Sequence, residues 1–204
     1  MILALRALGV GDLATAVPAL RGLRAAHPGE RLALAAPRWL APLVDLIGVV
    51  DRLVPVDGLA GERALAGHRP ALAVNLHGRG PQSHRLLRAA GPGRTIAYAC
   101  PEAGHTDGPR WRDDEHEVVR WCRLLGWYGI PADPDDLALR RPPGGGGGPT
   151  GGGPTGGGLT IVHPGAKAPA RRWPADRFAA VARELRGAGH RVAVTGSPEE
   201  RGLA

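Results

Sequence analysis

The sequence of 204 residues predicts an α/β fold in which parallel strands are covered by helices. Three observations lead to this fold class. Short apolar runs alternate with helical patterns as far as residue 143, residues 144–158 consist only of Gly, Pro and Thr, and the alternation starts again at residue 159. Strands that are separated by helices pair in parallel, whereas antiparallel strands usually follow one another through short turns.

The elements before the Gly-rich stretch follow one another in a regular order. Their apolar runs are short and continuous, as in strands that are buried on both faces of a parallel sheet. We expect strands at 2–5, 32–36, 49–56, 72–76 and 95–98. The helical patterns predict helices at 13–26, 39–47, 59–66, 83–90 and 114–126. Residues 1–143 are therefore predicted to form one complete lobe.

The segment 144–158 is predicted to be a flexible linker, because Gly keeps a large backbone entropy and Pro removes hydrogen-bond donors. After it we expect a strand at 159–162, a helix at 174–187 and a strand at 191–195. These few elements cannot cover both faces of a parallel sheet. Residues 159–204 are thus expected to be the start of a second lobe that is truncated at its C-terminal end.

The composition argues against several classes of protein. The net charge is +7, but the basic residues are scattered among Asp and Glu without interleaved aromatic residues, so no nucleic-acid-binding surface is predicted. No apolar stretch reaches the roughly 18 residues of a membrane span, and no signal peptide is indicated. Cys100 and Cys122 lack the spacing of a disulfide framework or a zinc site, and two free thiols fit a reducing cytoplasm.

The first candidate site is the turn at 8–13, which follows the first predicted strand. In open α/β sheets ligands bind beyond the carboxyl ends of the strands. Gly9 and Gly11 would let a ligand approach the backbone, and Asp12 is either a catalytic base or a helix cap. The turn is not a dinucleotide fingerprint, because the third glycine position is Ala14.

The second candidate site is the cationic segment 163–174, which runs from a strand end to a helix N-terminus. Its backbone amides and the cations Lys167, Arg171 and Arg172 would suit a diphosphate. A solvated basic loop is the alternative. Beyond the next strand, Glu200 would accept hydrogen bonds from a ribose or simply compensate a helix dipole.

Two further polar segments have open interpretations. The segment 75–80 would either bind an acceptor or form a plain strand-to-helix turn. The acidic segment 113–117 lacks the second His of a zinc-binding helix, and acidic residues often gather at helix starts, so no metal site is predicted.

Four motifs in a fixed order connect these segments to a known family. They are RALGVGDLATAVPAL at 6–20, NLHGRG at 75–80, HPGAKAPARRW at 163–173 and TGSPEER at 195–201. Together they resemble glycosyltransferase family nine, the ADP-heptose:lipopolysaccharide heptosyltransferase-like enzymes. The resemblance covers nearly the whole chain. It implies a GT-B-like α/β fold with two Rossmann-like lobes, of which the second is incomplete here.

The resemblance also implies an activity. Family members transfer a sugar from a nucleotide-sugar donor to the hydroxyl of a cell-envelope or other glycan acceptor, with inversion and without a metal or other cofactor. Asp12 matches the general base of the family. The residues that match the remaining roles are, for the donor diphosphate, Gly165, Ala166, Lys167 and Arg171; for the nucleotide ribose, Glu200; and for the acceptor side, Gly11, Asn75 and His77.

The sequence departs from the family pattern in two places. Arg171 stands where the family commonly has Lys, and no Asp-Thr-Gly-x-x-His-like motif follows. The implied partners are a nucleotide sugar and a glycan or lipid-linked acceptor, with peripheral contact to the inner face of a membrane. Two other interpretations remain: a non-catalytic truncated remnant, and a Rossmann-like module that only binds a nucleotide.

Overall fold

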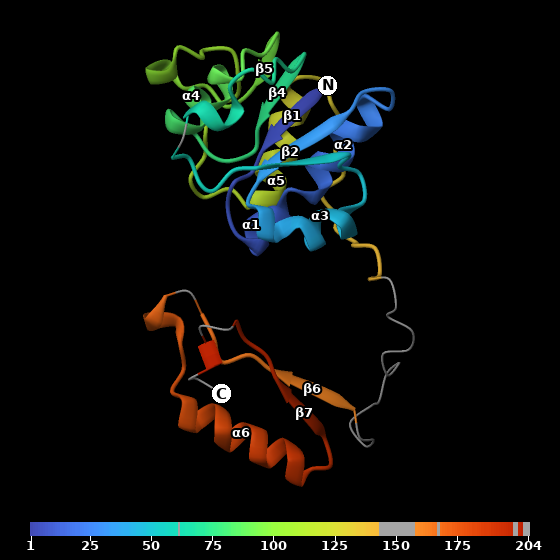
Figure 1. Cartoon of the computed structure of the whole chain (residues 1–204), viewed down its shortest axis with the longest axis vertical. Helices are drawn as coiled ribbons and strands as arrows, with labels where there is room; N and C mark the ends of the chain where they lie inside the picture. The colour runs from blue at the N-terminus through green and yellow to red at the C-terminus, as the bar shows by residue number, and fades with distance from the viewer. Residues whose placement is uncertain (61, 143–157, 167, 198–199, 202–204) are drawn as a thin grey trace. The chain divides into compact units, whose positions relative to one another are not determined.

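In a computed structural model the chain divides into two compact units, Met1–Pro142 and Pro143–Ala204 (Figure 1). The structure describes residues 1–60, 62–142, 158–166, 168–197 and 200–201. The predicted linker 144–158 lies outside the described residues except for Gly158.

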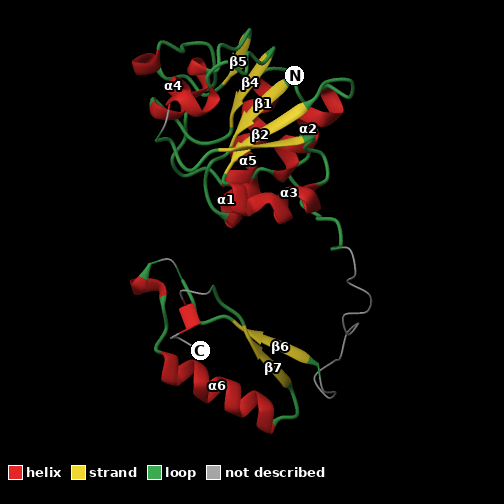
Figure 2. Ribbon diagram, viewed as in Figure 1, coloured by secondary structure: helices red, strands yellow, loops and turns green. Residues whose placement is uncertain are grey.

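The first unit is built on a five-stranded parallel sheet with the strand order β3-β2-β1-β4-β5 (Figure 2). The strands are β1 (Ile2–Leu5), β2 (Leu32–Ala36), β3 (Arg52–Pro55), β4 (Leu72–Asn75) and β5 (Arg94–Ile96). From β1 the chain builds outward through β2 to β3. The next strand, β4, pairs on the other side of β1, and β5 pairs with β4. The strand order therefore reverses its direction between β1 and β4.

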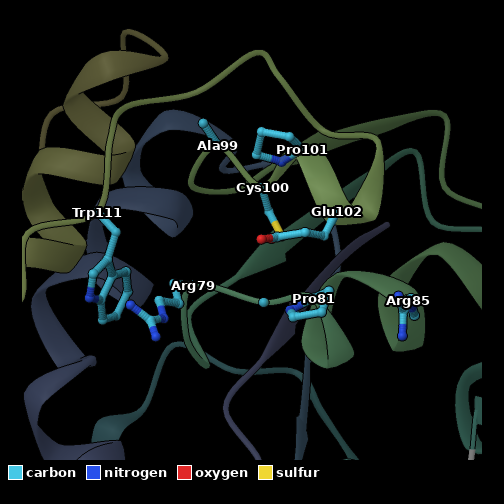
Figure 3. A pocket seen from close by; sticks show the side chains of 9 residues that line it. Arg79, Pro81, Arg85, Ala99, Cys100, Pro101, Glu102 and Trp111 are labelled. Atoms are coloured by element: carbon cyan, nitrogen blue, oxygen red, sulfur yellow. The ribbon is translucent and has the colours of Figure 1, made fainter.

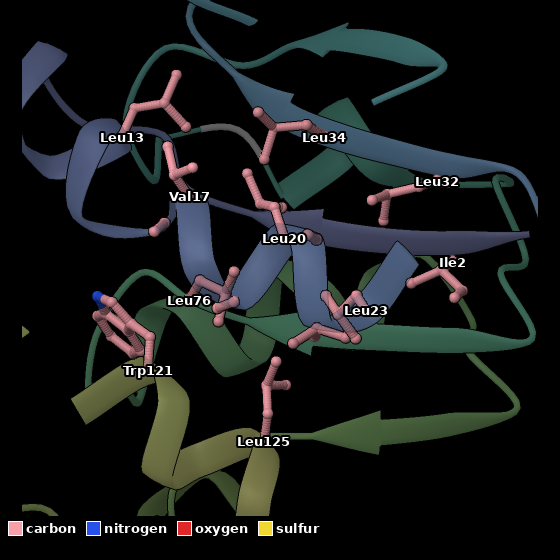
Figure 4. Packing of buried hydrophobic residues seen from close by; sticks show 14 of the residues in the cluster. Ile2, Leu13, Val17, Leu20, Leu23, Leu32, Leu34, Leu76, Trp121 and Leu125 are labelled. Carbon is pink, nitrogen blue, oxygen red and sulfur yellow. The ribbon is translucent and has the colours of Figure 1, made fainter. Parts of the chain in front are cut away.

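Helices cover both faces of this sheet. Side chains of β1 alternate between the faces, with Ile2 and Ala4 in one apolar cluster and Leu3 and Leu5 in the other. The first cluster lies under α1 (Val10–Thr15), α2 (Val17–Ala26), α3 (Ala41–Ile47) and α5 (Glu117–Trp127). The second lies under α4 (Gln82–Ala89) and the 3-10 turn η2 (Glu62–Leu65). Figure 4 shows α2 and α5 sending Leu20, Leu23, Trp121 and Leu125 into the first cluster.

The long helix predicted at 13–26 is divided in two. Helix α1 ends at Thr15 and α2 begins at Val17, with Ala16 between them. Pro18 has no N–H to donate to the carbonyl four residues earlier, so the first helix cannot run on through it. The prediction missed this break because the apolar period continues unchanged across it.

Two other predicted elements are shorter than expected. The helix predicted at 59–66 is only the 3-10 turn Glu62–Leu65, and the strand predicted at 49–56 pairs only over Arg52–Pro55. This strand is at the edge of the sheet, where Pro is tolerated because no further strand needs its N–H. The other predicted elements of this unit are present with boundaries shifted by a few residues.

The second unit consists of one parallel strand pair and one long helix. Strands β6 (Leu159–Val162) and β7 (Arg191–Val194) pair in register, and α6 (Ala175–Gly187) packs on one face of the pair. Phe178 of α6 and Val162 of β6 line the space between helix and sheet. On the strand β6, Leu159 and Ile161 are exposed, at 47% and 62%.

A matched pair of helical glycines tests the packing of the first unit. A Cβ on Gly22 of α2 would lie 2.7 Å from the carbonyl oxygen of Pro131, whereas a Cβ on Gly126 of α5 would meet no atom within 4 Å. We expect Gly22→Ala to lower the free energy of unfolding by about 1–3 kcal/mol through overpacking. Gly126→Ala should raise it by up to about 1 kcal/mol, because Ala has the higher helix propensity. Urea unfolding of both variants measures this, and equal effects would contradict the described packing.

Candidate functional site

The loops that follow β1 and β4 border the place where the strand order of the first sheet reverses. Because the chain leaves these two neighbouring strands toward opposite sides, a crevice opens at their carboxyl ends, and ligands of open α/β sheets bind in such crevices. The predicted base Asp12 follows β1, and the predicted acceptor-side residue His77 follows β4. The fold thus brings together residues that are 65 positions apart in the sequence.

Asp12 lies in the first turn of α1, where it caps the helix and still reaches solvent. Its Oδ2 accepts a hydrogen bond of 3.0 Å from the backbone N–H of Gly9, which is the N-cap residue. The Asp12 side chain is 47% exposed, so an external hydroxyl can approach its carboxylate. Gly11 is exposed beside it, and a Cβ at Gly11 would meet nothing within 4 Å. Packing in the described structure therefore does not explain the glycine at position 11.

Arg6 is a functional candidate that the sequence alone did not single out. It ends the apolar run of β1 and is only 1% exposed. Its Nε donates to the carbonyl oxygen of Asp12 at 2.8 Å, and its Nη1 donates to the carbonyl oxygen of Leu76 at 2.5 Å. Its Nη2 lies 2.9 Å from a carboxylate oxygen of Glu117, and the guanidinium stacks 4.7 Å from the ring centre of Trp121. Burial lowers the pKa of Arg6 and the bond to Glu117 opposes this, but an arginine stays charged.

His77 is held in its neutral form. Burial, together with the positive charge of Arg6, lowers the pKa of His77 from 6.5 to about 4, and the carboxylate of Asp12 acts in the opposite direction. The Nδ1 atom of His77 is buried and has no hydrogen-bond partner among the described residues. Because Nδ1 has no access to solvent, a bound hydroxyl would meet this neutral imidazole at its other nitrogen, Nε2.

Asn75 is fully buried and its side chain is used inside the protein. Its amide nitrogen donates to Ser83 Oγ at 2.9 Å and to His84 Nδ1 at 3.1 Å, and its Oδ1 accepts the N–H of His77. His84 must then donate from Nε2 to the carbonyl of Tyr98, which is possible in the neutral tautomer. Burial lowers the pKa of His84 in agreement with this. The segment 75–80 was expected either to bind an acceptor or to form a plain strand-to-helix turn. The internal hydrogen bonds of Asn75 fit the turn.

A pocket of about 600 Å³ lies beside this loop (Figure 3). It is lined by Arg79, Gly80, Pro81, Arg85, Ala99, Cys100, Pro101, Glu102 and Trp111. Figure 3 shows Trp111 and Arg79 at one end and Arg85 at the other. The Trp111 ring contacts the Trp121 ring at 6.0 Å between centroids, and Trp121 contacts Arg6, so the pocket wall and Asp12 belong to one connected cluster. An aromatic face with guanidinium and carboxylate groups is suited to a sugar.

The acidic segment 113–117 is used to bind arginines. Glu115 forms an ion pair with Arg123, and Glu117 pairs with Arg120 as well as Arg6. Where the structure describes the chain, no group of three or more His, Cys, Asp or Glu side chains is placed to hold a metal. In the same residues, no helix combines the length and the hydropathy that crossing a bilayer requires.

The second unit brings two of the predicted donor residues into contact. A Cβ on Gly165 would lie 2.2 Å from Oε1 of Glu200, so the carboxylate of Glu200 occupies the space that this glycine leaves free. Oε2 of Glu200 accepts the backbone N–H of Ser197 at 2.9 Å. Glu200 and Ser197 also line a small pocket of about 160 Å³ at the carboxyl ends of β6 and β7.

The other predicted donor residues belong to the loop before α6. Arg171 is exposed, and Ala166 accepts a hydrogen bond from Arg172 Nε at 2.8 Å. This bond holds one cation of the loop against its own backbone. Lys167, which was also predicted to bind the diphosphate, lies outside the described residues.

Residues 155–204 match the sequence profile of glycosyltransferase family 9 (heptosyltransferase). Three solved structures are similar to the chain. E. coli ADP-heptose lps heptosyltransferase II has 22% identity and a TM-score of 0.75, and the match covers 99% of this chain and 66% of that one. The family 9 glycosyl transferase from Veillonella parvula DSM 2008 has 20% identity and a TM-score of 0.71, covering 99% and 64%. E. coli heptosyltransferase WaaC with ADP has 17% identity and a TM-score of 0.70, covering 99% and 69%. No curated protein matches the chain significantly.

The predicted resemblance to family 9 is confirmed. For residues 155–204 the resemblance rests on the match to the sequence profile. These residues include Gly165 and Glu200, which are in contact. For the first unit the structural matches show the fold, and the predicted GT-B-like α/β class is confirmed with them. The chain spans 66% and 64% of the lengths of the first two structures.

The neutral state of His77 predicts a pH dependence of stability. Between pH 6.5 and about 4 the folded state binds fewer protons at His77 than the unfolded chain does. The free energy of unfolding should therefore fall as the pH is lowered through this range. His77→Gln removes this contribution, while His84 contributes equally in both proteins. Urea unfolding at several pH values measures the difference, and identical slopes against pH in both proteins would show that His77 is not held neutral.

Proposed function

We propose that the chain acts in glycosyl transfer from a nucleotide-sugar donor to a hydroxyl of a glycan or lipid-linked acceptor, with inversion. One observation carries the proposal. A half-exposed carboxylate, Asp12, lies at the reversal point of a parallel sheet near the neutral His77, in a chain whose residues 155–204 match family 9. The free thiols Cys100 and Cys122 support a reducing, cytoplasmic location.

The proposed reaction is a single displacement. The acceptor oxygen attacks the anomeric carbon of the donor and its proton moves to the carboxylate of Asp12. The bond between the anomeric carbon and the diphosphate oxygen breaks, and the nucleoside diphosphate leaves with the electron pair. Attack on the side opposite to the leaving group inverts the configuration. His77, which is neutral at pH 7, is proposed to hydrogen-bond the acceptor.

The acceptor is proposed to bind in the first unit. Gly11 leaves the backbone open beside Asp12, and the pocket with Arg79 and Trp111 offers a surface for a sugar ring. Asn75 is buried, so we propose that it holds the loop in place and does not contact the acceptor. Peripheral contact with the inner face of a membrane is part of the proposal when the acceptor is lipid-linked.

The donor is proposed to bind at the carboxyl ends of β6 and β7. Gly165, Ala166, Lys167 and Arg171 would surround the diphosphate, and Glu200 would accept hydrogen bonds from the ribose. Because E. coli heptosyltransferase WaaC was solved with ADP and with ADP-2-deoxy-2-fluoro heptose, adenine nucleotides are the first donors to test.

A second candidate is a nucleotide-binding module without turnover. The position of the sequence match favours this second candidate. The match is confined to residues 155–204, which hold the proposed donor-binding residues. The two candidates agree on nucleotide binding and differ in whether Asp12 takes part in a reaction.

Substitution of Asp12 separates the candidates. Asp12→Asn should lower kcat by about 10²–10⁴-fold, the usual contribution of a general base, and should leave ADP affinity unchanged. The measurement is ADP release from ADP-heptose in the presence of a lipopolysaccharide-derived glycan. Asp45→Asn, at an exposed position on α3, is the matched control and should keep full activity. Full activity of Asp12→Asn would rule out the base, and ADP binding without any transfer by the wild type would support the second candidate.

A glycine substitution tests the donor side. Gly165→Ala should displace the carboxylate of Glu200 and weaken ADP binding by about tenfold or more, the loss expected for one hydrogen bond to a charged group. Glu200→Gln should weaken binding to a similar degree, and the combined variant little further. Gly187→Ala is the control, since a Cβ there meets nothing within 4 Å. Calorimetric titration with ADP measures the affinities, and unchanged binding by Gly165→Ala would contradict the assignment of Glu200.

A further inference from the structure

We propose that Arg6 is a positioning residue that fixes the Asp12 carboxylate relative to the loop of His77, and that Glu117 anchors Arg6 in this role. The proposal rests on the proposed function, because it assigns Asp12 as the base. All the residues that it involves belong to the first unit.

The guanidinium of Arg6 connects the two loops that border the crevice. It donates at once to the carbonyl oxygen of Asp12, in the loop and helix after β1, and to the carbonyl oxygen of Leu76, directly before His77. Among the hydrogen bonds of residues 1–60 and 62–142, no other joins the segment 8–15 to the segment 76–81. Besides the sheet bond in which the N–H of Leu76 donates to the carbonyl oxygen of Leu5, one side chain therefore links the two loops at this point.

Arg6 also places a positive charge beside the Asp12 carboxylate. Its Nη2 lies 3.7 Å from Oδ1 of Asp12, while Oδ2 is held by the N–H of Gly9 at 3.0 Å. The two N–H groups of Nη2 donate to Glu117 and Thr15, so Arg6 acts on Oδ1 through its charge, and this attraction and the bond from Gly9 favour one orientation of the carboxylate. The remaining exposed side is left for an acceptor hydroxyl, and general-base catalysis requires such a defined geometry.

Glu117 anchors the guanidinium at Nη2, the same nitrogen that lies near Asp12. It lies in the first turn of α5 and accepts a hydrogen bond from Trp121 Nε1 at 3.0 Å with the same oxygen that pairs with Arg6. Its other oxygen pairs with Arg120. The ring of Trp121, which is fully buried, lies against the guanidinium. Two residues of α5, Glu117 and Trp121, thus hold the guanidinium of Arg6 in place.

A buried ion pair is a poor way to gain stability. Burying a guanidinium costs desolvation energy, and well-packed apolar side chains usually stabilise a core equally well. The Arg6 side chain is 1% exposed, whereas its partner Asp12 is 47% exposed. The charge is buried on the protein side of a carboxylate that faces solvent, which is the arrangement expected of a group that orients a reactive side chain.

Lysine cannot reproduce this arrangement. The guanidinium presents five donors in a rigid planar fork, whereas an ammonium group has its three donors on one nitrogen. A lysine at position 6 keeps the positive charge but cannot reach the carbonyls of Asp12 and Leu76 and the carboxylate of Glu117 together. Arg6→Lys is therefore the informative substitution.

Arg24 provides a matched control in the same unit. It also donates to backbone carbonyls, those of Val49 and Glu30, and pairs with a carboxylate, that of Asp51. Its partner Asp51 accepts the N–H of Leu32 at the amino end of β2, away from the crevice. Arg24→Lys therefore disturbs a comparable network at the opposite edge of the sheet.

The kinetic test uses the full chain with ADP-heptose and the glycan acceptor. Arg6→Lys should lower kcat by about tenfold to hundredfold and leave KM for the donor unchanged, because only the alignment of the base is lost. Arg24→Lys should keep the wild-type kcat. In the Asp12→Asn background, Arg6→Lys should cause no further loss. Losses that multiply in the double variant, or an equal loss in Arg24→Lys, would overturn the proposal.

Amide hydrogen exchange tests the same role without any reaction. In the full chain without substrate, Arg6→Lys should speed exchange of the N–H groups of Gly9 and His77 by about tenfold and leave Leu20 of α2 unchanged. Unchanged exchange at Gly9 and His77 would overturn the proposal even if the wild type transfers sugar. If the wild type transfers no sugar, the proposed function fails and the exchange rates alone decide whether Arg6 holds Asp12.

Discussion

The positive charge of Arg6 is buried directly after β1, the central strand of the first sheet, and it needs partners there. Its partners come from α1, from the end of β4 and from the first turn of α5. The interaction links α5, which also packs on the sheet through apolar side chains, to the two loops that border the crevice. A group that is costly to bury therefore lies at the centre of the candidate site.

Most of the fold follows from features that are local in the sequence. Each strand of the first unit is buried on both faces except at the edges, so each appears as a short apolar run, and the intervening helices force parallel pairing. What the pattern did not reveal is the break of the first helix before Pro18 and the reduction of the helix at 59–66 to a 3-10 turn. Both concern backbone hydrogen bonds, which leave no trace in an apolar period. The place where the strand order reverses also depends on tertiary packing.

The candidate site was predictable only where its residues follow strand ends. Asp12 and His77 follow strands of the first sheet and Glu200 follows a strand of the second unit, and the resemblance to family nine selected these side chains among their neighbours. Glu117 was not predicted, because 111 positions separate it from Arg6 and no local pattern links them. Asn75 has the residue type of a ligand-binding side chain, and only its complete burial shows that its bonds are internal. The contact of Gly165 with Glu200 likewise depends on two loops meeting in space.

The aromatic cluster of Tyr98, Trp111 and Trp121 makes intrinsic tryptophan fluorescence a reporter for the first unit. Trp111 lines the pocket and contacts both Trp121 and Tyr98, at ring distances of 6.0 and 5.1 Å. An indole emits according to the polarity around it, and a sugar that displaces water from the pocket would change that polarity for Trp111 first. The other tryptophans do not line this pocket. A ligand in the pocket would thus change the fluorescence of Trp111, which also contacts Arg6 through Trp121. Acceptor binding can therefore be followed without an added label.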